Sequence, residues 1–177
     1  MTTLSIDQVR DKIRAIPNFP KEGIVFRDIT TGLKDAQALH MMIDYMSEQF
    51  KNEKIDYIVG AESRGFIFGT AMAYKMNCGF VPVRKPNKLP AQTISESYEL
   101  EYGTDRIEIH SDAIEKGANV LFVDDLLATG GTAKAACNLI RKVGGNLIGA
   151  AFLIELPELH GREKLHDCGK VISMLQY

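Results

Sequence analysis

A stretch of thirteen residues, 120–132, constrains the fold of this chain more than any other part. It reads Val-Leu-Phe-Val-Asp-Asp-Leu-Leu-Ala-Thr-Gly-Gly-Thr. Its first four residues are apolar, rich in valine and bounded by polar or glycine-rich sequence, which predicts a strand over 119–124 that is buried on both faces of a parallel sheet. A helical segment is expected from about 133 to 143. The stretch therefore predicts a strand, a sharp turn and a helix in succession.

The turn of this unit, Ala128 to Thr132, predicts an anion site. Its small residues let the backbone bend, so that successive N–H groups and a helix N-terminus hold a phosphate without a basic side chain. Asp124 and Asp125 precede the turn, so the ligand is expected to carry hydroxyl groups beside its phosphate, as a ribose 5-phosphate does. The spacing matches neither a P-loop nor a Rossmann fingerprint. The alternative is a tight turn in which Thr132 caps the helix and the acids face solvent.

A second turn of the same kind follows the strand predicted over 55–61. It reads Glu62-Ser63-Arg64-Gly65 and precedes an apolar helix that begins near Phe66. The arginine offers the forked pair of donors that suits two pyrophosphate oxygens. The alternative is an arginine exposed on an ordinary loop.

The rest of the second half alternates strands with helices. Further strands are predicted over 80–84, 146–154 and 171–175, and a helix over 35–50. This alternation predicts an α/β fold with a central, mostly parallel sheet flanked by helices, whose ligands bind at the carboxyl ends of the strands.

Several other segments are predicted to lie outside that sheet. Ser5 to Gln8 has the form of a capping box, which predicts a helix to about Ala15, and 23–28 predicts a short β-like run. Residues 85–97 lack periodicity and predict a long loop, read as a lid. The alternation on either side of Gly103, over 98–102 and 106–109, predicts a two-stranded antiparallel flap, with a plain solvated hairpin as the alternative.

Composition excludes several classes of protein. The 177 residues carry a net charge of only -2, and their acids and bases are interspersed, which indicates no nucleic-acid partner and no membrane patch. The longest apolar run, 147–154, is too short for a bilayer, and the N-terminus has no signal-peptide core. One domain in the cytoplasm is therefore expected.

The cysteines and histidines predict no disulfide framework and no metal site. Cys78, Cys137 and Cys168 are widely spaced without a C-x-x-C motif, so they are expected to be reduced, partly buried thiols. His160 and His166 have no acid or thiol cluster beside them in the sequence and are read as surface residues.

The segment from Val123 to Gly131 resembles the motif that binds 5-phosphoribosyl-1-pyrophosphate (PRPP) in the type I phosphoribosyltransferases, and it is similar to the version found in the adenine phosphoribosyltransferases. Residues 25–27, 100–103 and 161–165 match the same enzymes, so the resemblance covers nearly the whole chain. It implies the type I phosphoribosyltransferase fold with a small N-terminal hood and a mobile flap. The chain is then a single domain, 1–177, with 1–34 mainly helix and hood and 55–177 the core.

The resemblance also implies a reaction. Adenine and PRPP give AMP and diphosphate, with Mg²⁺ carried on PRPP rather than by a metal site of the protein, in a homodimer. One alternative is a transferase for hypoxanthine or xanthine. Another is a PRPP-sensing transcription regulator, which would need an added DNA-binding module.

The resemblance assigns residues to three tasks. The catalytic residues are Glu101, Asp124, Asp125 and Arg64; the PRPP-binding residues are Ser63, Arg64, Lys85, Lys88, Tyr102, Asp124, Asp125, Ala128, Thr129, Gly130, Gly131 and Thr132; the adenine-binding residues are Val25, Phe26, Arg27 and Leu126. Glu101 is implied as the proton acceptor at the imidazole edge of the purine. The Glu62–Ser63 peptide bond is implied to be cis.

Overall fold

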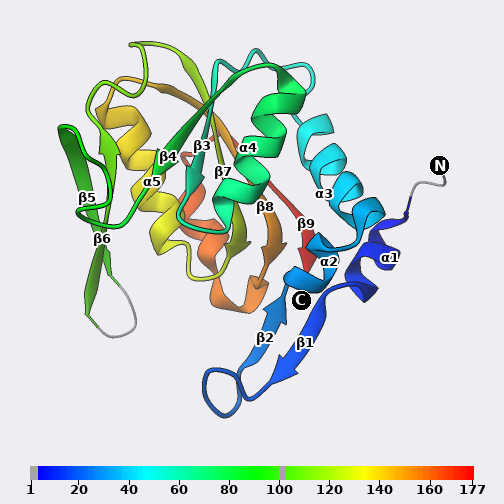
Figure 1. The fold of residues 1–177 in the computed structure, drawn as a ribbon. Helices are drawn as coiled ribbons and strands as arrows, with labels where there is room; N and C mark the ends of the chain where they lie inside the picture. The colour runs from blue at the N-terminus through cyan, green and yellow to red at the C-terminus, as the bar shows by residue number, and fades with distance from the viewer. Residues whose placement is uncertain (1–3, 100–102) are drawn as a thin grey trace. The chain divides into compact units, whose positions relative to one another are not determined.

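The structure, a computed structural model, describes residues 4–99 and 103–177. The chain divides into two compact units, residues 1–45 and 46–177, each of which is considered by itself. Figure 1 shows the order of their helices and strands along the chain. The single-domain organisation stays a prediction.

The first unit consists of short elements. They are α1 (Ile6–Asp11), β1 (Arg14–Pro17), β2 (Val25–Asp28), α2 (Thr30–Leu33) and the first part of α3 (Ala36–Glu48). The Ser5 hydroxyl accepts from the Gln8 amide and the Gln8 side chain accepts from the Ser5 amide, so the predicted capping box is confirmed. The helix was wrongly expected to reach Ala15, because the chain from Arg14 onward pairs with β2 in a two-stranded antiparallel sheet instead.

The second unit is built on one parallel sheet. Its elements are β3 (Tyr57–Ala61), α4 (Gly65–Met76), β4 (Gly79–Val83), β5 (Thr93–Glu99), β6 (Thr104–His110), β7 (Asn119–Leu127), α5 (Gly131–Lys142), β8 (Asn146–Glu155), the 3-10 helices η1 (Pro157–Leu159) and η2 (Gly161–Leu165), and β9 (Lys170–Gln176). The sheet has five strands in the order β4-β3-β7-β8-β9, and all of its pairings are parallel. The predicted sheet is thus confirmed.

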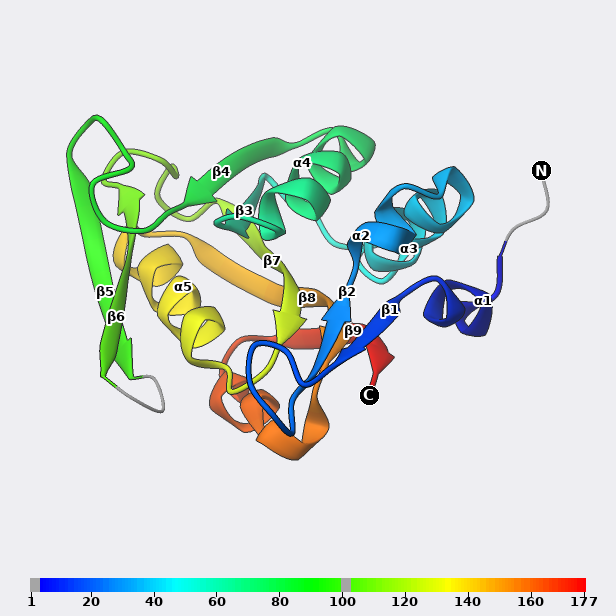
Figure 2. The same ribbon diagram turned by 60° about the horizontal axis from the view of Figure 1, so that its bottom comes forward.

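The helices α4 and α5 cover opposite faces of this sheet (Figure 2). The connection from β3 through α4 to β4 and the connection from β7 through α5 to β8 run outward from the centre of the sheet in opposite directions. Because such connections are right-handed, they place the two helices on different faces. Central strand β7 is consequently enclosed, and Val120 to Val123 have no exposed surface. The carboxyl ends of β3 and β7 lie side by side at one edge of the sheet, because these strands are neighbours.

Two predicted boundaries were wrong. Strand β7 does not end at Asp124 but continues to Leu127, because Asp124 and Leu126 pair with Phe152 and Ile154 of β8. The segment 85–97 is not all loop, because β5 begins at Thr93 and pairs with β6. The predicted antiparallel pairing of the flap is confirmed for the described residues of β5 and β6, and 100–102 of its first predicted strand lie outside them.

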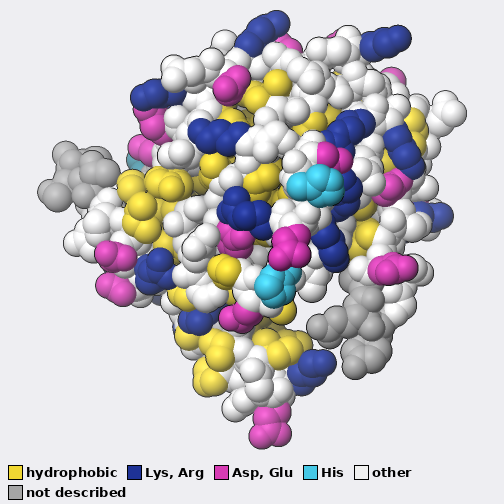
Figure 3. All heavy atoms as spheres, turned by 180° about the vertical axis from the view of Figure 1, so that it is seen from behind, with side chains coloured by type: hydrophobic (Ala, Val, Ile, Leu, Met, Phe, Trp, Pro, Cys, Tyr) yellow, Lys and Arg dark blue, Asp and Glu magenta, His cyan; other side chains and the backbone are white. Residues whose placement is uncertain are grey.

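Figure 3 shows one face of the molecule, on which Lys and Arg side chains are interspersed with Asp and Glu side chains. On this face the side chains are mixed as the small net charge suggests. Within residues 4–99 and 103–177, no helix combines the length and the apolar character that crossing a bilayer requires.

Candidate active site

The two glycine-containing turns predicted as anion sites lie next to each other. Gly60 of β3 is in register with Val123 of β7, so the residues that follow these strands emerge together. Arg64 then reaches across, and its Nε lies 2.8 Å from Asp125 Oδ2. The predicted guanidinium and one of the predicted acids thus form an ion pair at the carboxyl edge of the sheet.

The two acids differ in their surroundings. Asp125 is only 6% exposed and Asp124 is more open, with its Oδ1 accepting from the Asp125 amide at 2.9 Å. Burial raises the pKa of Asp124 well above its ordinary value, and the Asp125 carboxylate beside it adds to that rise. Burial also raises the pKa of Asp125, against the opposing effect of the Arg64 guanidinium. A cationic ligand beside Asp124 would therefore help this carboxyl to ionise.

The turn after β7 has the geometry of an anion cradle. Gly130 has φ +76° and lies directly before α5, with no side chain to cap the helix. Thr132 is not the capping residue, so that alternative is wrong. The Lys134 amide is the first to donate to this turn, at 2.9 Å to the Gly130 carbonyl. The earlier N–H groups of the helix have no carbonyl within it, which leaves them to face a bound anion.

Arg84 and the predicted Lys85, at the start of the lid, are held by acids. Glu62 accepts from Arg84 Nη2 at 2.8 Å and from the Lys85 amide at 3.1 Å, and the hydrogen bond from Arg84 lowers the pKa of Glu62. The Lys85 ammonium bonds to Asp105 and lies 2.9 Å from the Tyr98 hydroxyl. The Lys88 side chain is exposed, while its carbonyl accepts from Arg84.

The remaining site predictions concern residues outside the described part of the chain, the peptide bond before Ser63, and residues of the first unit. Glu101 and Tyr102 lie outside the described residues. The Glu62–Ser63 peptide bond is cis, as the resemblance implies. In the first unit, Phe26 packs edge to face against Phe19 with 5.2 Å between ring centroids, and Val25 is exposed. The predictions that Val25, Phe26, Arg27 and Leu126 bind adenine, and that Ser63 binds PRPP, stay predictions.

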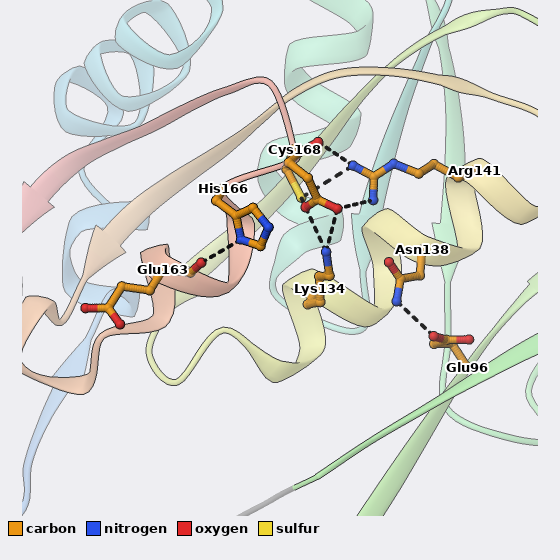
Figure 4. A network of polar contacts seen from close by, with 8 residues as sticks. Glu96, Lys134, Asn138, Arg141, Glu163, His166 and Cys168 are labelled. Carbon is orange, nitrogen blue, oxygen red and sulfur yellow. Dashed lines mark hydrogen bonds and ion pairs between the residues drawn. The ribbon is translucent and has the colours of Figure 1, made fainter.

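The sequence alone did not indicate how the flap is attached. Figure 4 shows Asn138 of α5 pointing at Glu96 of β5, and its Nδ2 lies 2.9 Å from Glu96 Oε1. Lys142 bonds to the other oxygen of Glu96. The Tyr98 ring lies against Gly131, where a Cβ would come within 3.0 Å of it. The sequence signal for this attachment is the alternation of Ile94, Glu96 and Tyr98, which lie on the face of β5 that packs on α5.

Known proteins match this chain over most of its length. A model of the phosphoribosyl transferase domain family matches residues 30–173. The adenine phosphoribosyltransferase of Brachyspira hyodysenteriae is 59% identical over 158 residues, which cover 89% of this chain and 93% of that protein.

Solved structures agree with the sequence relatives. The crystal structure of adenine phosphoribosyltransferase from Thermoanaerobacter pseudethanolicus matches with a TM-score of 0.94 and 49% identity, covering 98% of this chain and 100% of that one. The Saccharomyces cerevisiae enzyme, complexed with an imino-altritol bisphosphate and adenine, matches with a TM-score of 0.90 and 42% identity over 96% of this chain and 98% of its own. These likenesses confirm the predicted fold. The chain belongs to the adenine phosphoribosyltransferases of the phosphoribosyl transferase domain family.

Proposed function

We propose that this chain transfers the 5-phosphoribosyl group of PRPP to adenine through the site at the carboxyl ends of β3 and β7, releasing AMP and diphosphate. The observation that carries the proposal is the Arg64–Asp125 ion pair, which brings the two anion-binding turns together. The yeast relative was crystallised with a bisphosphate and adenine, and these are the kinds of ligand, phosphates and a purine base, that the site is proposed to bind.

The proposed chemistry depends on separating charge at the ribose C1 atom. The C1–O bond to diphosphate weakens before the purine nitrogen has finished its attack, so the ring becomes cationic and the leaving group becomes more anionic. Asp124 and Asp125 hold the ribose hydroxyls and stabilise the cationic ring, while Arg64 stabilises the leaving group. The turn from Ala128 to Thr132 fixes the 5-phosphate, which does not change during the reaction.

The carboxylate oxygens of Asp124 and Asp125 are adjacent and of the kind that magnesium prefers, which suits a Mg²⁺ ion that arrives with PRPP. Mg²⁺ bound with PRPP would supply positive charge to the departing diphosphate. Glu101, proposed to take the proton at the imidazole edge of adenine, and Tyr102, proposed to bind PRPP, complete the assignment together with Lys85 and Lys88.

A panel of bases tests the proposed function. Adenine, hypoxanthine, guanine, xanthine and orotate are each incubated with PRPP and Mg²⁺, and diphosphate release is followed. Release with adenine well above that with every other base is the expected result. Release with xanthine or hypoxanthine instead would assign the chain to another purine, and release with no base would refute transfer altogether.

Arg64→Gln is expected to lower kcat by about a hundredfold, because the positive charge beside the leaving group is lost. Arg64→Lys keeps the charge and loses the fork, so about a tenfold loss is expected. Steady-state kinetics with adenine saturating measures both. Equal activity in the two variants and the unmodified enzyme would remove Arg64 from the mechanism.

We also propose a homodimer that works in the cytoplasm, as the resemblance implies. The exposed apolar side chains of Ile67 and Tyr74 on α4, 43% and 92% accessible, support an association surface. Light scattering coupled to size exclusion measures the mass, and a monomer at assay concentration would contradict the dimer.

A further inference from the structure

The anion cradle is in direct contact with a segment thirty residues further along the chain. A Cβ atom on Gly161 would lie 2.1 Å from the Ala128 carbonyl oxygen and 2.8 Å from the Gly130 amide nitrogen. Conversely, a Cβ atom on Gly130 would lie 2.4 Å from the Gly161 carbonyl oxygen. Real Cβ atoms do not approach other atoms this closely, so the two main chains touch where any side chain would force them apart.

The segment that carries Gly161 is itself anchored to the sheet. Its next residue, Arg162, donates from Nε to Glu155 Oε1 at 2.8 Å and from Nη1 to the Val171 carbonyl at 2.9 Å. Glu155, at the end of β8, is only 3% exposed, and the hydrogen bond from Arg162 lowers its pKa. A buried, charge-assisted contact of this kind fixes the start of the segment firmly.

The end of the segment is fixed to α5, the helix that begins at the cradle. Figure 4 shows Lys134 and Arg141 of this helix pointing toward the chain at Cys168, and an acid next to Cys168 in the sequence binds both of them. That acid is Asp167, whose two carboxylate oxygens each lie 2.7 Å from Lys134 Nζ. Arg141 adds an ion pair of 3.3 Å to Oδ2 and a hydrogen bond of 2.5 Å to the Asp167 carbonyl.

We propose that Gly161 is a positioning residue for PRPP. The main chain of Gly161 forms a rigid wall behind the cradle and fixes the directions of the N–H groups of the cradle. Arg162 and Asp167 hold this wall in place at its two ends. The inference rests on the proposed binding of the 5-phosphate in this turn. Its physical sense is preorganisation: N–H groups that are already aimed at the phosphate need no ordering when the ligand binds.

Gly161→Ala tests the wall. The added methyl group pushes on the Ala128 carbonyl and the Gly130 amide, so the cradle turns away from the 5-phosphate. We expect the KM for PRPP and the Kd for ribose 5-phosphate to rise at least about tenfold, while kcat at saturating PRPP stays within about threefold. The Kd for diphosphate, held at the other turn, should not change. Isothermal titration with ribose 5-phosphate and with diphosphate separates the two turns.

Gly149→Ala is the matched control. A Cβ at Gly149 would meet the Lys170 carbonyl oxygen at 2.3 Å, a clash close to that at Gly161. Gly149 lies near the amino end of β8, whereas the cradle follows the carboxyl end of β7. This variant should lose stability in thermal unfolding and keep its Kd for ribose 5-phosphate. Asp167→Asn, which weakens the anchor without a clash, should raise the same Kd by about threefold.

The outcomes distinguish the inference from the function on which it rests. If the unmodified protein binds diphosphate and not ribose 5-phosphate, the placement of the 5-phosphate fails and the inference fails with it. If it binds both, but Gly161→Ala changes neither Kd, or weakens both equally, the inference alone is overturned. Loss of ribose 5-phosphate affinity in Gly149→Ala as large as in Gly161→Ala would likewise show that only stability is involved.

Discussion

Asp124→Asn is expected to lower kcat by about a thousandfold while the KM for PRPP changes by less than about tenfold. The substitution keeps the size of the side chain and removes its charge, and the charge matters most when the ribose ring becomes cationic. Steady-state kinetics with both substrates varied measures the two constants. Full kcat with only a raised KM would remove Asp124 from the stabilisation of the cationic ring.

The same substitution is expected to stabilise the fold at neutral pH. Burial and Asp125 raise the pKa of Asp124 in the folded protein, so ionising this carboxyl disfavours folding. That penalty is fully present above the raised pKa and disappears as the pH falls below the ordinary value of about 3.9. Asp124→Asn should therefore raise Tm at pH 7 and lose this advantage near pH 4. Thermal unfolding at both pH values measures it, and a lowered Tm at pH 7 would contradict the sign of the shift.

Hypoxanthine is expected to be used about ten-thousandfold less efficiently than adenine, as kcat/KM. In the proposed pose, the Val25 carbonyl accepts from the 6-amino group of adenine and the Arg27 amide donates to N1. Hypoxanthine presents an oxygen to the carbonyl and an N–H to the amide, so both contacts become repulsive. Use of hypoxanthine within about tenfold of adenine would refute this pose.

In that pose the main chain of β2 recognises the base, and the side chains of Val25 and Arg27 take no part in the choice between adenine and hypoxanthine. Replacing the side chains of Val25 or Arg27 should therefore leave the preference for adenine intact. Phe26→Ala should weaken every base by removing a stacking surface.

Most of the parallel sheet and both turns could be predicted from the sequence because their signals are local. The apolar run at 120–123 and the glycines that follow it lie within a few residues of each other, and so does the turn from Glu62 to Gly65. Arg64 and Asp125 could then be placed together, because parallel neighbouring strands bring their carboxyl ends to one edge.

The features that the sequence did not reveal depend on pairing at long range. Residues 14–17 are a strand only because 25–28 lies beside them, and Thr93 begins β5 only because His110 pairs with it. Gly161 carries no local sign of its contact with Gly130, since that contact exists only after β8 and α5 have packed. A glycine required by a distant main chain looks in a sequence like any other glycine.

The pairing of β3 with β7 also sets the distance between the segments that follow these two strands. The turn proposed to receive diphosphate and the strand end proposed to receive the ribose leave the sheet from adjacent strands, whose spacing of about 4.8 Å is fixed by the hydrogen bonds between them. The sheet thus sets the distance between the two parts of the site that are proposed to bind the ends of PRPP. Side-chain changes in either turn alter how tightly each end of PRPP is held, but the span between the ends changes only if the two strands slip in register.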